Sequence, residues 1–287
     1  MNRLLELLAA EALEKQLNVF HIAVTDDTQR TEEAHIRSAN PCQDVYSSAK
    51  AFTATAVGIL CDRGLMTLED RVTDILAPFV VADMDEKWKR MTVRHLLTHR
   101  CGFEGSYLDI DKYDRKDFGT DDFLGYLFRT PLIFAPGEAY SYSDAAYYVL
   151  SRIVSQVSGM GLDDFLWKEV FSPLGVREAA WSKCPMGYAM GATGLYIRAA
   201  DVAKLASCYV FGGKYFDRKL FSEAWVREAC GGCAFVSDES GLFYFKSGMR
   251  GQMMLFSPEK RISVAWTAYE KNCQPLVMCV RRYLAEN

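Results

Sequence analysis

The sequence predicts an α+β fold, in which an antiparallel sheet formed by the N- and C-terminal segments is flanked by helices and a mainly helical subdomain is inserted between them. Residues rich in β-branched and aromatic side chains occur at 18–25 and again between 242 and 269. The intervening residues, about 50–205, carry apolar positions at helical spacing. Strands near both ends with helices between them are typical of α+β proteins rather than of alternating α/β folds.

We expect residues 1–287 to form a single domain, because no linker, internal repeat or low-complexity tract divides the chain. Residues 1–50 and 205–287 would form its α/β part and residues 51–204 its mainly helical part, with approximate boundaries. A chain of this length has ample material for a large apolar core.

The first third of the chain is predicted as a helix, a strand and then further helices. The N-terminal segment MNRLLELLAAEALEKQLNVF indicates an amphipathic helix, and Asn18–Thr25 indicates a strand. The polar residues 26–40 indicate a hairpin-like connection. Helices are then expected at 47–60, 67–76 and 92–99, the last capped by Thr92.

The remainder changes from helices to strands. Residues 104–122 are acidic, aromatic and irregular, which indicates a loop. Apolar spacing predicts helices at 121–129, 145–158, 163–170 and 201–206. Strands are expected at 242–246, 252–257 and 261–269, with a hairpin turn at 257–260 and a closing helix at 274–284.

Composition excludes several classes of function. The hydrophobic and charged fractions, 50% and 24%, are those of ordinary globular proteins. A net charge of −4 provides no basic surface for nucleic acid, and no apolar run is long enough to span a membrane. Glu6 interrupts the N-terminal apolar run, and the odd count of nine cysteines does not indicate a disulfide framework. We therefore expect a cytoplasmic location, no cofactor and no bound metal; the oligomeric state stays open.

A candidate nucleophile and base occur together in the segment Tyr46-Ser47-Ser48-Ala49-Lys50, which continues as an uncharged, Ala-rich helix to Leu60. Residues three apart share a helix face, so the Lys50 amine can lie beside the Ser47 hydroxyl. A serine is a poor nucleophile until a neighbouring base takes its proton. The alternative is a surface pair in which serine only caps a helix.

Two further motifs follow along the chain. Tyr142-Ser143-Asp144 precedes an apolar helix, and Lys246-Ser247-Gly248 ends a predicted strand. In this order the three motifs resemble those of the serine β-lactamase and penicillin-binding-protein superfamily. They are most similar to the branch of class C β-lactamases, DD-peptidases, D-aminopeptidases and esterases. Segments 60–72 and 91–99 also resemble this branch, and the likeness spans about residues 43–270.

The resemblance implies a serine hydrolase that forms an acyl-enzyme. Ser47 would attack a carbonyl group while Lys50 and Tyr142 move its proton. Lys246 and Ser247, with Gly248 behind them, would meet a substrate carboxylate or phenolic oxygen. The oxyanion would lie between the backbone N–H groups of Ser47 and Met249. The substrate would be a small molecule or peptide: a D-residue peptide, a small ester or a β-lactam.

The identity of the base stays open between Lys50 and Tyr142. Burial against the apolar helix and a nearby second cation, Lys246, would both lower the pKa of Lys50. The branch usually has Asn where this chain has Asp144, and a carboxylate there would instead stabilise the Lys50 ammonium. Either Asp144 is kept neutral, or Lys50 stays charged and Tyr142 takes the larger share of proton transfer.

Asp144 also suggests a hypothesis about substrates. An ionised Asp offers only acceptors, whereas Asn also donates. We expect Asp144 to disfavour β-lactams, whose side-chain carbonyl needs a donor, and to favour substrates that present an amine or N–H group. The alternative is that Asp144 merely caps the following helix. Asp144 is also the one feature that favours an inactive descendant which binds a ligand or partner in the same cleft.

Three other groups of residues are interpreted structurally. Cys230-Gly231-Gly232-Cys233 has the spacing of a metal or redox site but lacks a second pair, which indicates a loop with two free thiols. His95 and His99 are four residues apart but lack the glutamate of a zinc-protease helix. The acidic residues of the 104–122 loop lack calcium-loop spacing, and we expect them to be solvated: Asp109, Asp111, Asp114 and Asp117.

Overall fold

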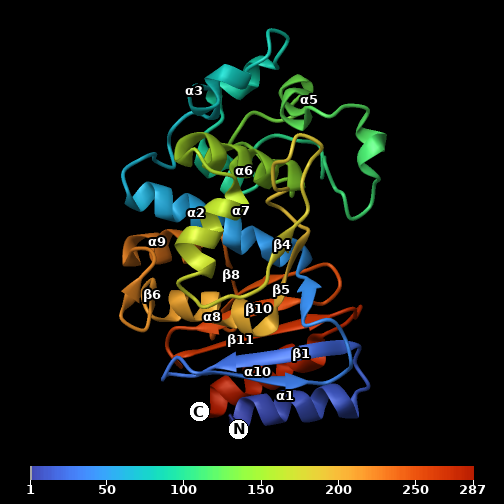
Figure 1. The fold of residues 1–287 in the computed structure, drawn as a ribbon, viewed down its shortest axis with the longest axis vertical. Helices are drawn as coiled ribbons and strands as arrows, with labels where there is room; N and C mark the ends of the chain where they lie inside the picture. The colour runs from blue at the N-terminus through green and yellow to red at the C-terminus, as the bar shows by residue number, and fades with distance from the viewer. Residues whose placement is uncertain (1) are drawn as a thin grey trace.

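The computed structural model describes residues 2–287 and brings segments from opposite ends of the chain into one sheet (Figure 1). Six strands lie in the order β2-β1-β11-β10-β9-β8, and every neighbouring pair is antiparallel. Their bounds are β1 Val19–Thr25, β2 Thr31–His35, β8 Val236–Ser237, β9 Tyr244–Ser247, β10 Met253–Ser257 and β11 Ile262–Ala268. Ile22 of β1 lies opposite Trp266 of β11. The predicted α+β fold is confirmed.

Alternation of side chains gives this sheet an apolar core on each face. Along β10, Met254 and Phe256 enter the large core beneath the helical region, whereas Leu255 enters a second core on the opposite face. Along β11, Ala265 belongs to the large core and Trp266 to the second. Because successive side chains of a strand point to opposite faces, apolar residues at consecutive positions produce a sheet buried on both sides.

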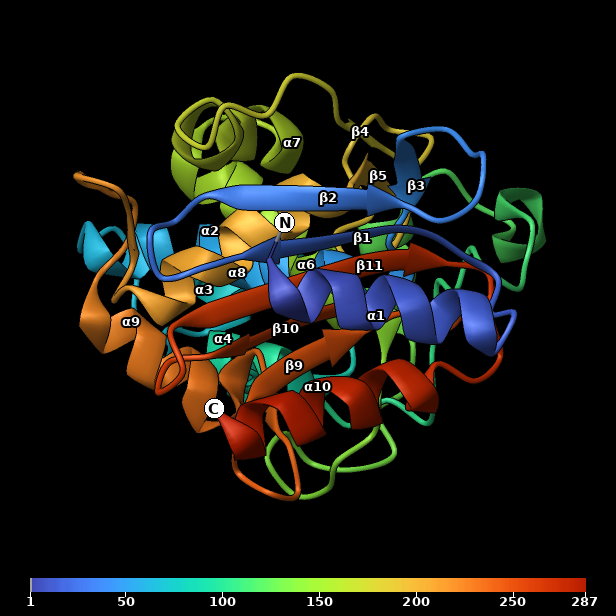
Figure 2. The same ribbon diagram turned by 90° about the horizontal axis from the view of Figure 1, so that it is seen from below.

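Helices cover both faces of the sheet. Helices α1 (Arg3–Glu14) and α10 (Gln274–Glu286) lie side by side on the outer face, as Figure 2 shows from below. On α1 the buried residues Leu4, Leu8 and Ala12 recur every four positions and form the stripe that packs on the sheet. Helix α8 (Ala199–Val210) covers the inner face and separates the sheet from the helices above it.

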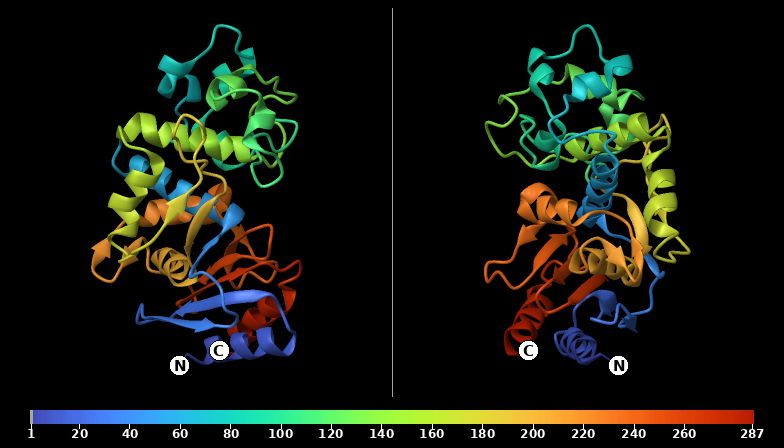
Figure 3. Two further views of the ribbon diagram at one scale, coloured as in Figure 1. Left: turned by 45° about the vertical axis from the view of Figure 1, so that its right-hand side comes forward. Right: turned by 90° about the vertical axis from the view of Figure 1, so that its left-hand side faces the viewer.

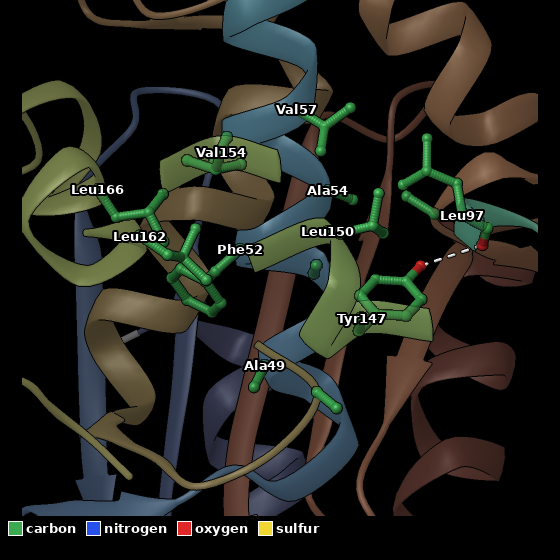
Figure 4. Packing of buried hydrophobic residues seen from close by; sticks show 14 of the residues in the cluster. Ala49, Phe52, Ala54, Val57, Leu97, Tyr147, Leu150, Val154, Leu162 and Leu166 are labelled. Atoms are coloured by element: carbon green, nitrogen blue, oxygen red, sulfur yellow. Dashed lines mark hydrogen bonds between the residues drawn. The ribbon is translucent and has the colours of Figure 1, made fainter. Parts of the chain in front are cut away.

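The helical region gathers at the end of the molecule opposite the termini (Figure 3). Its centre is α2 (Ala49–Asp62), which is buried from Ala49 to Leu60 and packs against α6 (Asp144–Ser158). Figure 4 shows Phe52 and Val57 of α2 close to Leu150 and Val154 of α6. The remaining helices are α3 Val72–Ile75, α4 Val93–Leu97, α5 Phe123–Arg129, α7 Leu162–Leu166 and α9 Glu223–Glu228.

Several short elements escape the sequence patterns. A small sheet in the order β3-β5-β4 joins Cys42–Asp44, Leu195–Arg198 and Ala180–Trp181. The hairpin β6 (Lys214–Tyr215) and β7 (Arg218–Lys219), the edge strand β8 and helix α9 were also not predicted. Elements of two to six residues are too short to display a hydrophobic period. Among the helices of residues 2–287, none has the length and apolar character needed to cross a membrane.

Candidate active site

Ser47 lies in a single turn of 3₁₀ helix, Tyr46–Ser48, that connects β3 to α2. The sequence predicted an α-helix through Ser47, and this is wrong by two residues because α2 begins at Ala49. The turn starts from a left-handed backbone at Tyr46, where φ is 46°, a conformation that side chains other than glycine rarely adopt. In a 3₁₀ turn the side chains three apart lie above one another, so the predicted pairing survives. The Lys50 Nζ lies 3.1 Å from the Ser47 Oγ.

Lys50 is fully buried in the first turn of α2, and its ammonium group is saturated by three acceptors. Besides Ser47, Nζ donates to the carboxylate Oδ1 of Asp144 at 2.6 Å and to the carbonyl of Ala192 at 3.0 Å. The loop that carries Ala192 is held against α2 because the Thr53 hydroxyl donates to the Gly191 carbonyl at 2.7 Å. An ammonium has three protons, and each finds a partner here.

Tyr142 and Asp144 reach the site from the start of α6. The Tyr142 hydroxyl donates to the Ser47 Oγ at 2.7 Å, and its ring centre lies 4.8 Å from the Lys50 Nζ. Ser143, not Asp144, occupies the N-cap position of α6, and the Asp144 carboxylate bonds to Lys50. The interpretation of Asp144 as a simple helix cap is therefore wrong, since its side chain points at the catalytic candidates.

The third motif ends β9 directly beside Ser47. The Ser48 hydroxyl donates to the Lys246 carbonyl at 3.1 Å and fixes the strand to the 3₁₀ turn. A Cβ atom on Gly248 would lie 2.7 Å from the Val45 carbonyl oxygen and 2.5 Å from the Gln252 Oε1. Only glycine permits this approach without displacement of the chain. The fold thus brings residues separated by two hundred positions into contact.

A cavity of about 400 Å³ opens in front of Ser47. The predicted site residues on its wall are Ser47, Tyr142, Lys246, Ser247, Gly248 and Met249. Lys50 and Asp144 lie behind Ser47 in the protein interior. All the candidates that the sequence singled out are therefore brought together, six on the cavity wall and two beneath it.

The oxyanion prediction names the backbone N–H groups of two residues that line the cavity, Ser47 and Met249. The N–H of Ser47 is in the first turn of its 3₁₀ helix, where amide groups lack an intrahelical partner. The N–H of Met249 follows the end of β9. Within residues 2–287, neither group donates a hydrogen bond to the protein. Both donors remain available to a substrate oxygen.

The two lysines differ in protonation, and the difference favours the alternative in which Lys50 stays charged. Burial lowers the pKa of Lys50, but the Asp144 carboxylate and the Tyr142 hydroxyl group together outweigh burial and raise it above the ordinary value. For Lys246 burial dominates, the Lys50 charge acts in the same direction, and the pKa falls to about 7. Among residues 2–287, no carboxylate forms an ion pair with Lys246. Lys50 is thus the stable cation and Lys246 the lysine that titrates near neutrality.

His99 contacts the site although the sequence indicated only a structural role. Its ring stacks on Tyr142 with centroids 4.4 Å apart, and its Nδ1 accepts the N–H of Ser143 at 3.2 Å. Burial, then the charges of Lys246 and Lys50, lower the pKa of His99 to about 2. The ring is therefore neutral with its proton on Nε2, and it holds the Tyr142 phenol in place. No local pattern marks a stacking partner that is 43 residues away.

The acidic loop is only partly solvated. Asp114 and Asp117 are exposed as expected, but Asp109 is buried and Asp111 is half-buried. Carboxylate oxygens of Asp109, Asp111 and Asp144 lie within 4.8 Å of one another. Each contacts a donor: Lys112 lies at 2.8 Å from Asp109, Thr193 at 2.6 Å from Asp111, and Lys50 pairs with Asp144. The expectation of a solvated face fails for these two residues because the loop folds over the start of α6.

The remaining sequence candidates occupy supporting positions. Cys230 and Cys233 are free thiols, as predicted, in a turn at Ala229–Cys233 whose helical backbone is interrupted at Gly232, where φ is 108°. Cys233 reaches the cavity wall, where Arg94 donates to its sulfur at 3.5 Å. His95 accepts the N–H of Thr92 through Nδ1 and thereby closes the first turn of α4.

Comparison with known proteins agrees with this geometry. The family model described as Beta-lactamase matches residues 22–271, which include every element of the candidate site. The chain belongs to the β-lactamase family. The match to the family therefore extends well beyond the three short motifs and includes most of the chain.

Relatives in the β-lactamase family carry several different names. The chain is 35% identical over 143 residues to penicillin-binding protein 4 of Amycolatopsis lactamdurans, across 46% of this chain and 34% of that protein. It is 34% identical over 146 residues to esterase EstB of Burkholderia gladioli, across 47% of this chain and 37% of that protein. The matches to these two proteins therefore span about a third of their length.

A solved structure matches over nearly its full length. A penicillin-binding protein homologue from Caulobacter crescentus superimposes with a TM-score of 0.80, covering 100% of this chain and 98% of that one. At 15% identity this likeness concerns the β-lactamase fold alone.

Proposed function

We propose that this protein is a serine hydrolase that cleaves an ester or amide through an acyl-enzyme on Ser47. The observation that carries the proposal is the position of the Ser47 Oγ, 2.7 Å from the Tyr142 Oη and 3.1 Å from the Lys50 Nζ at the wall of a cavity. Nucleophile and base within hydrogen-bond reach, with the base oriented by a further group, is the arrangement that nucleophilic catalysis requires.

In the proposed step the Ser47 hydroxyl would donate to a Tyr142 phenolate, the reverse of the hydrogen bond in the resting structure, and the Ser47 proton would pass to the Tyr142 Oη. Lys50 is unsuited as the base because Asp144 holds it as an ammonium whose three protons all have acceptors. The charge of Lys50 instead balances the negative charge that develops as Ser47 attacks. His99, stacked on the phenol, keeps Tyr142 in line with the serine. Of the alternatives that the sequence left open, the charged Lys50 with Tyr142 as base is the one we propose.

The reaction would proceed in two halves. Ser47 Oγ forms a bond to the substrate carbonyl, and the oxyanion accepts hydrogen bonds from the N–H groups of Ser47 and Met249. Donors of this kind each contribute about 2.7–4 kcal/mol. The bond to the leaving group then breaks, and the leaving group takes the proton that Tyr142 received. Water repeats the sequence on the acyl-enzyme and releases the acid.

The names of relatives support an ester or amide substrate but do not select one. They include an esterase, penicillin-binding proteins and putative D-alanyl-D-alanine carboxypeptidases. Lys246 would bind a substrate carboxylate while it is protonated. The hypothesis that Asp144 disfavours β-lactam substrates remains a prediction. Because the Asp144 carboxylate contacts Lys50, it would affect catalysis through the lysine as well as through contact with the substrate.

Labelling of the active serine tests the proposal. The protein is incubated with a fluorophosphonate and, separately, with a labelled penicillin, and the adduct is located by mass spectrometry. The expected result is a fluorophosphonate adduct on Ser47 that is absent from Ser47→Ala. Ser158→Ala, which removes a hydroxyl at the far end of α6 from Tyr142, serves as the matched control and should retain the adduct. Absence of adduct with both probes would favour the inactive, ligand-binding descendant.

A further inference from the structure

The cavity in front of Ser47 has an apolar wall that the proposed chemistry does not use. This wall comprises Leu97, Ala234, Phe235, Val236, Phe245 and Met249. Three apolar or aromatic side chains that line the cavity are exposed: Tyr140 is 62% exposed, Val236 56% and Met249 47%. Three such side chains around one opening form a surface that gains free energy when an apolar group covers it.

The position of Tyr142 determines which half of a substrate would enter. Tyr142 lines the cavity, whereas Lys50, Asp144 and Asp111 do not. In the proposed reaction Tyr142 returns its proton to the leaving group, so the leaving group must lie within hydrogen-bond reach of the Tyr142 Oη. The apolar cavity, whose wall includes Tyr142, is the space next to that oxygen.

We propose that this cavity binds the leaving group and selects alcohols or amines that carry an apolar or aromatic substituent. The inference rests on the proposed function and adds to it the chemical class of the group released. The size is suitable, because a cavity of about 150 Å³ can hold a benzene ring and this one measures about 400 Å³. Lys246 on the same wall would add a contact to a carboxylate of the substrate, and the preference for a leaving group with an apolar substituent would remain.

A series of acetate esters tests the assignment. Methyl, butyl and 2-phenylethyl acetate form the same acetyl-enzyme, so differences in kcat/KM report the acylation step and the group that leaves. Each buried methylene should raise kcat/KM about fourfold, and the increase from methyl to 2-phenylethyl should be at least about tenfold. Methyl esters of acetic, pentanoic and 3-phenylpropanoic acid form the reciprocal series, in which the change should be less than about threefold.

A polar substitution in the wall provides the second measurement. Val236→Thr keeps the shape of the side chain and replaces one methyl with a hydroxyl, so it should lower the ratio of kcat/KM for 2-phenylethyl over methyl acetate at least about twofold. Val80→Thr makes the same change at another exposed valine, at the end of the 3₁₀ turn Ala77–Phe79 in the helical region, and should leave the ratio unchanged.

The outcomes separate this inference from the proposed function. Three results would overturn the assignment of the cavity while hydrolysis and labelling of Ser47 persist. They are a kcat/KM that does not change along the acetate series, a kcat/KM that depends more strongly on the acyl group than on the leaving group, and an equal ratio of kcat/KM for 2-phenylethyl over methyl acetate in Val236→Thr and Val80→Thr. Absence of hydrolysis of every ester together with absence of the Ser47 adduct would overturn the proposed function and the inference with it.

Discussion

Replacement of Asp144 by asparagine tests the electrostatic arrangement beneath Ser47. The Asp144 carboxylate is the counter-charge of Lys50, at 2.6 Å and out of solvent. In Asp144→Asn the side-chain amide oxygen can still accept from the ammonium beside the Ser47 hydroxyl and the Ala192 carbonyl, but the negative counter-charge is lost. Removing one partner of a buried ion pair costs about 3–5 kcal/mol. For a chain of 287 residues, with an entropy of unfolding of about 600 cal/mol/K, such a loss lowers Tm by roughly 5–8 °C.

The pH dependence of the difference identifies its cause. In the wild type the pKa of Lys50 is raised above 10.5, so the stabilisation is complete below pH 10.5 and is lost as pH rises through the folded-state value. In Asp144→Asn burial dominates and lowers the pKa of Lys50. The variant therefore binds fewer protons folded than unfolded and gains stability as pH rises towards 10.5. The difference in Tm between the two proteins should shrink from pH 7 to pH 10.

The assay is thermal unfolding of both proteins from pH 6 to 10, with fluorophosphonate and penicillin labelling rates measured in parallel. Asp201→Asn serves as the matched control, because Asp201 pairs with Lys204 at 2.7 Å on α8, away from Ser47; it should change neither labelling rate. A neutral Lys50 gains the capacity to act as a base, so penicillin acylation should rise in Asp144→Asn. An unchanged Tm together with unchanged acylation would refute the assigned role of Asp144.

Three further changes follow from the same geometry. Tyr142→Phe removes the hydroxyl 2.7 Å from Ser47 and should lower kcat/KM by about 10²–10⁴, while Tyr140→Phe on the rim should have little effect. Because the pKa of Lys246 is about 7, kcat/KM for a substrate that carries a carboxylate should fall as pH rises through 7. In Lys246→Arg that decline should disappear, and its persistence would assign it to another group. Gly248→Ala places a methyl 2.7 Å from the Val45 carbonyl and should slow acylation at least about tenfold, measured by fluorophosphonate labelling; Gly231→Ala, which meets no atom within 4 Å, is its control.

The sequence was informative where a pattern is either long or chemically specific. Strands of seven residues, β1 and β11, were found from their β-branched content, and the pairing of chain ends followed from their positions. Ser47 was singled out because a lysine three residues further on could activate it, and Tyr142 and Lys246 because their motifs resemble those of the superfamily. Their assembly in one cavity agrees with the prediction, and the catalytic roles remain proposals.

What the sequence could not provide depends on contacts between distant segments. The protonation of Lys50 is set by Asp144 and that of Lys246 by burial and by Lys50, and none of these distances can be read from spacing along the chain. His99 acquires its role only because its ring stacks on Tyr142. The burial of Asp109 likewise arises from the path of a loop rather than from its acidic composition.

The pairing of β1 with β11 has a consequence for synthesis of the protein. A chain that emerges from the ribosome N-terminus first exposes β1 early, but its partner β11, Ile262–Ala268, is made more than about two hundred residues later. Meanwhile the uncharged stretch Ala51–Leu60 of α2 would lack the β10 and β11 side chains that belong to the same core. Long-range pairing of this kind slows folding and leaves apolar surface accessible to aggregation.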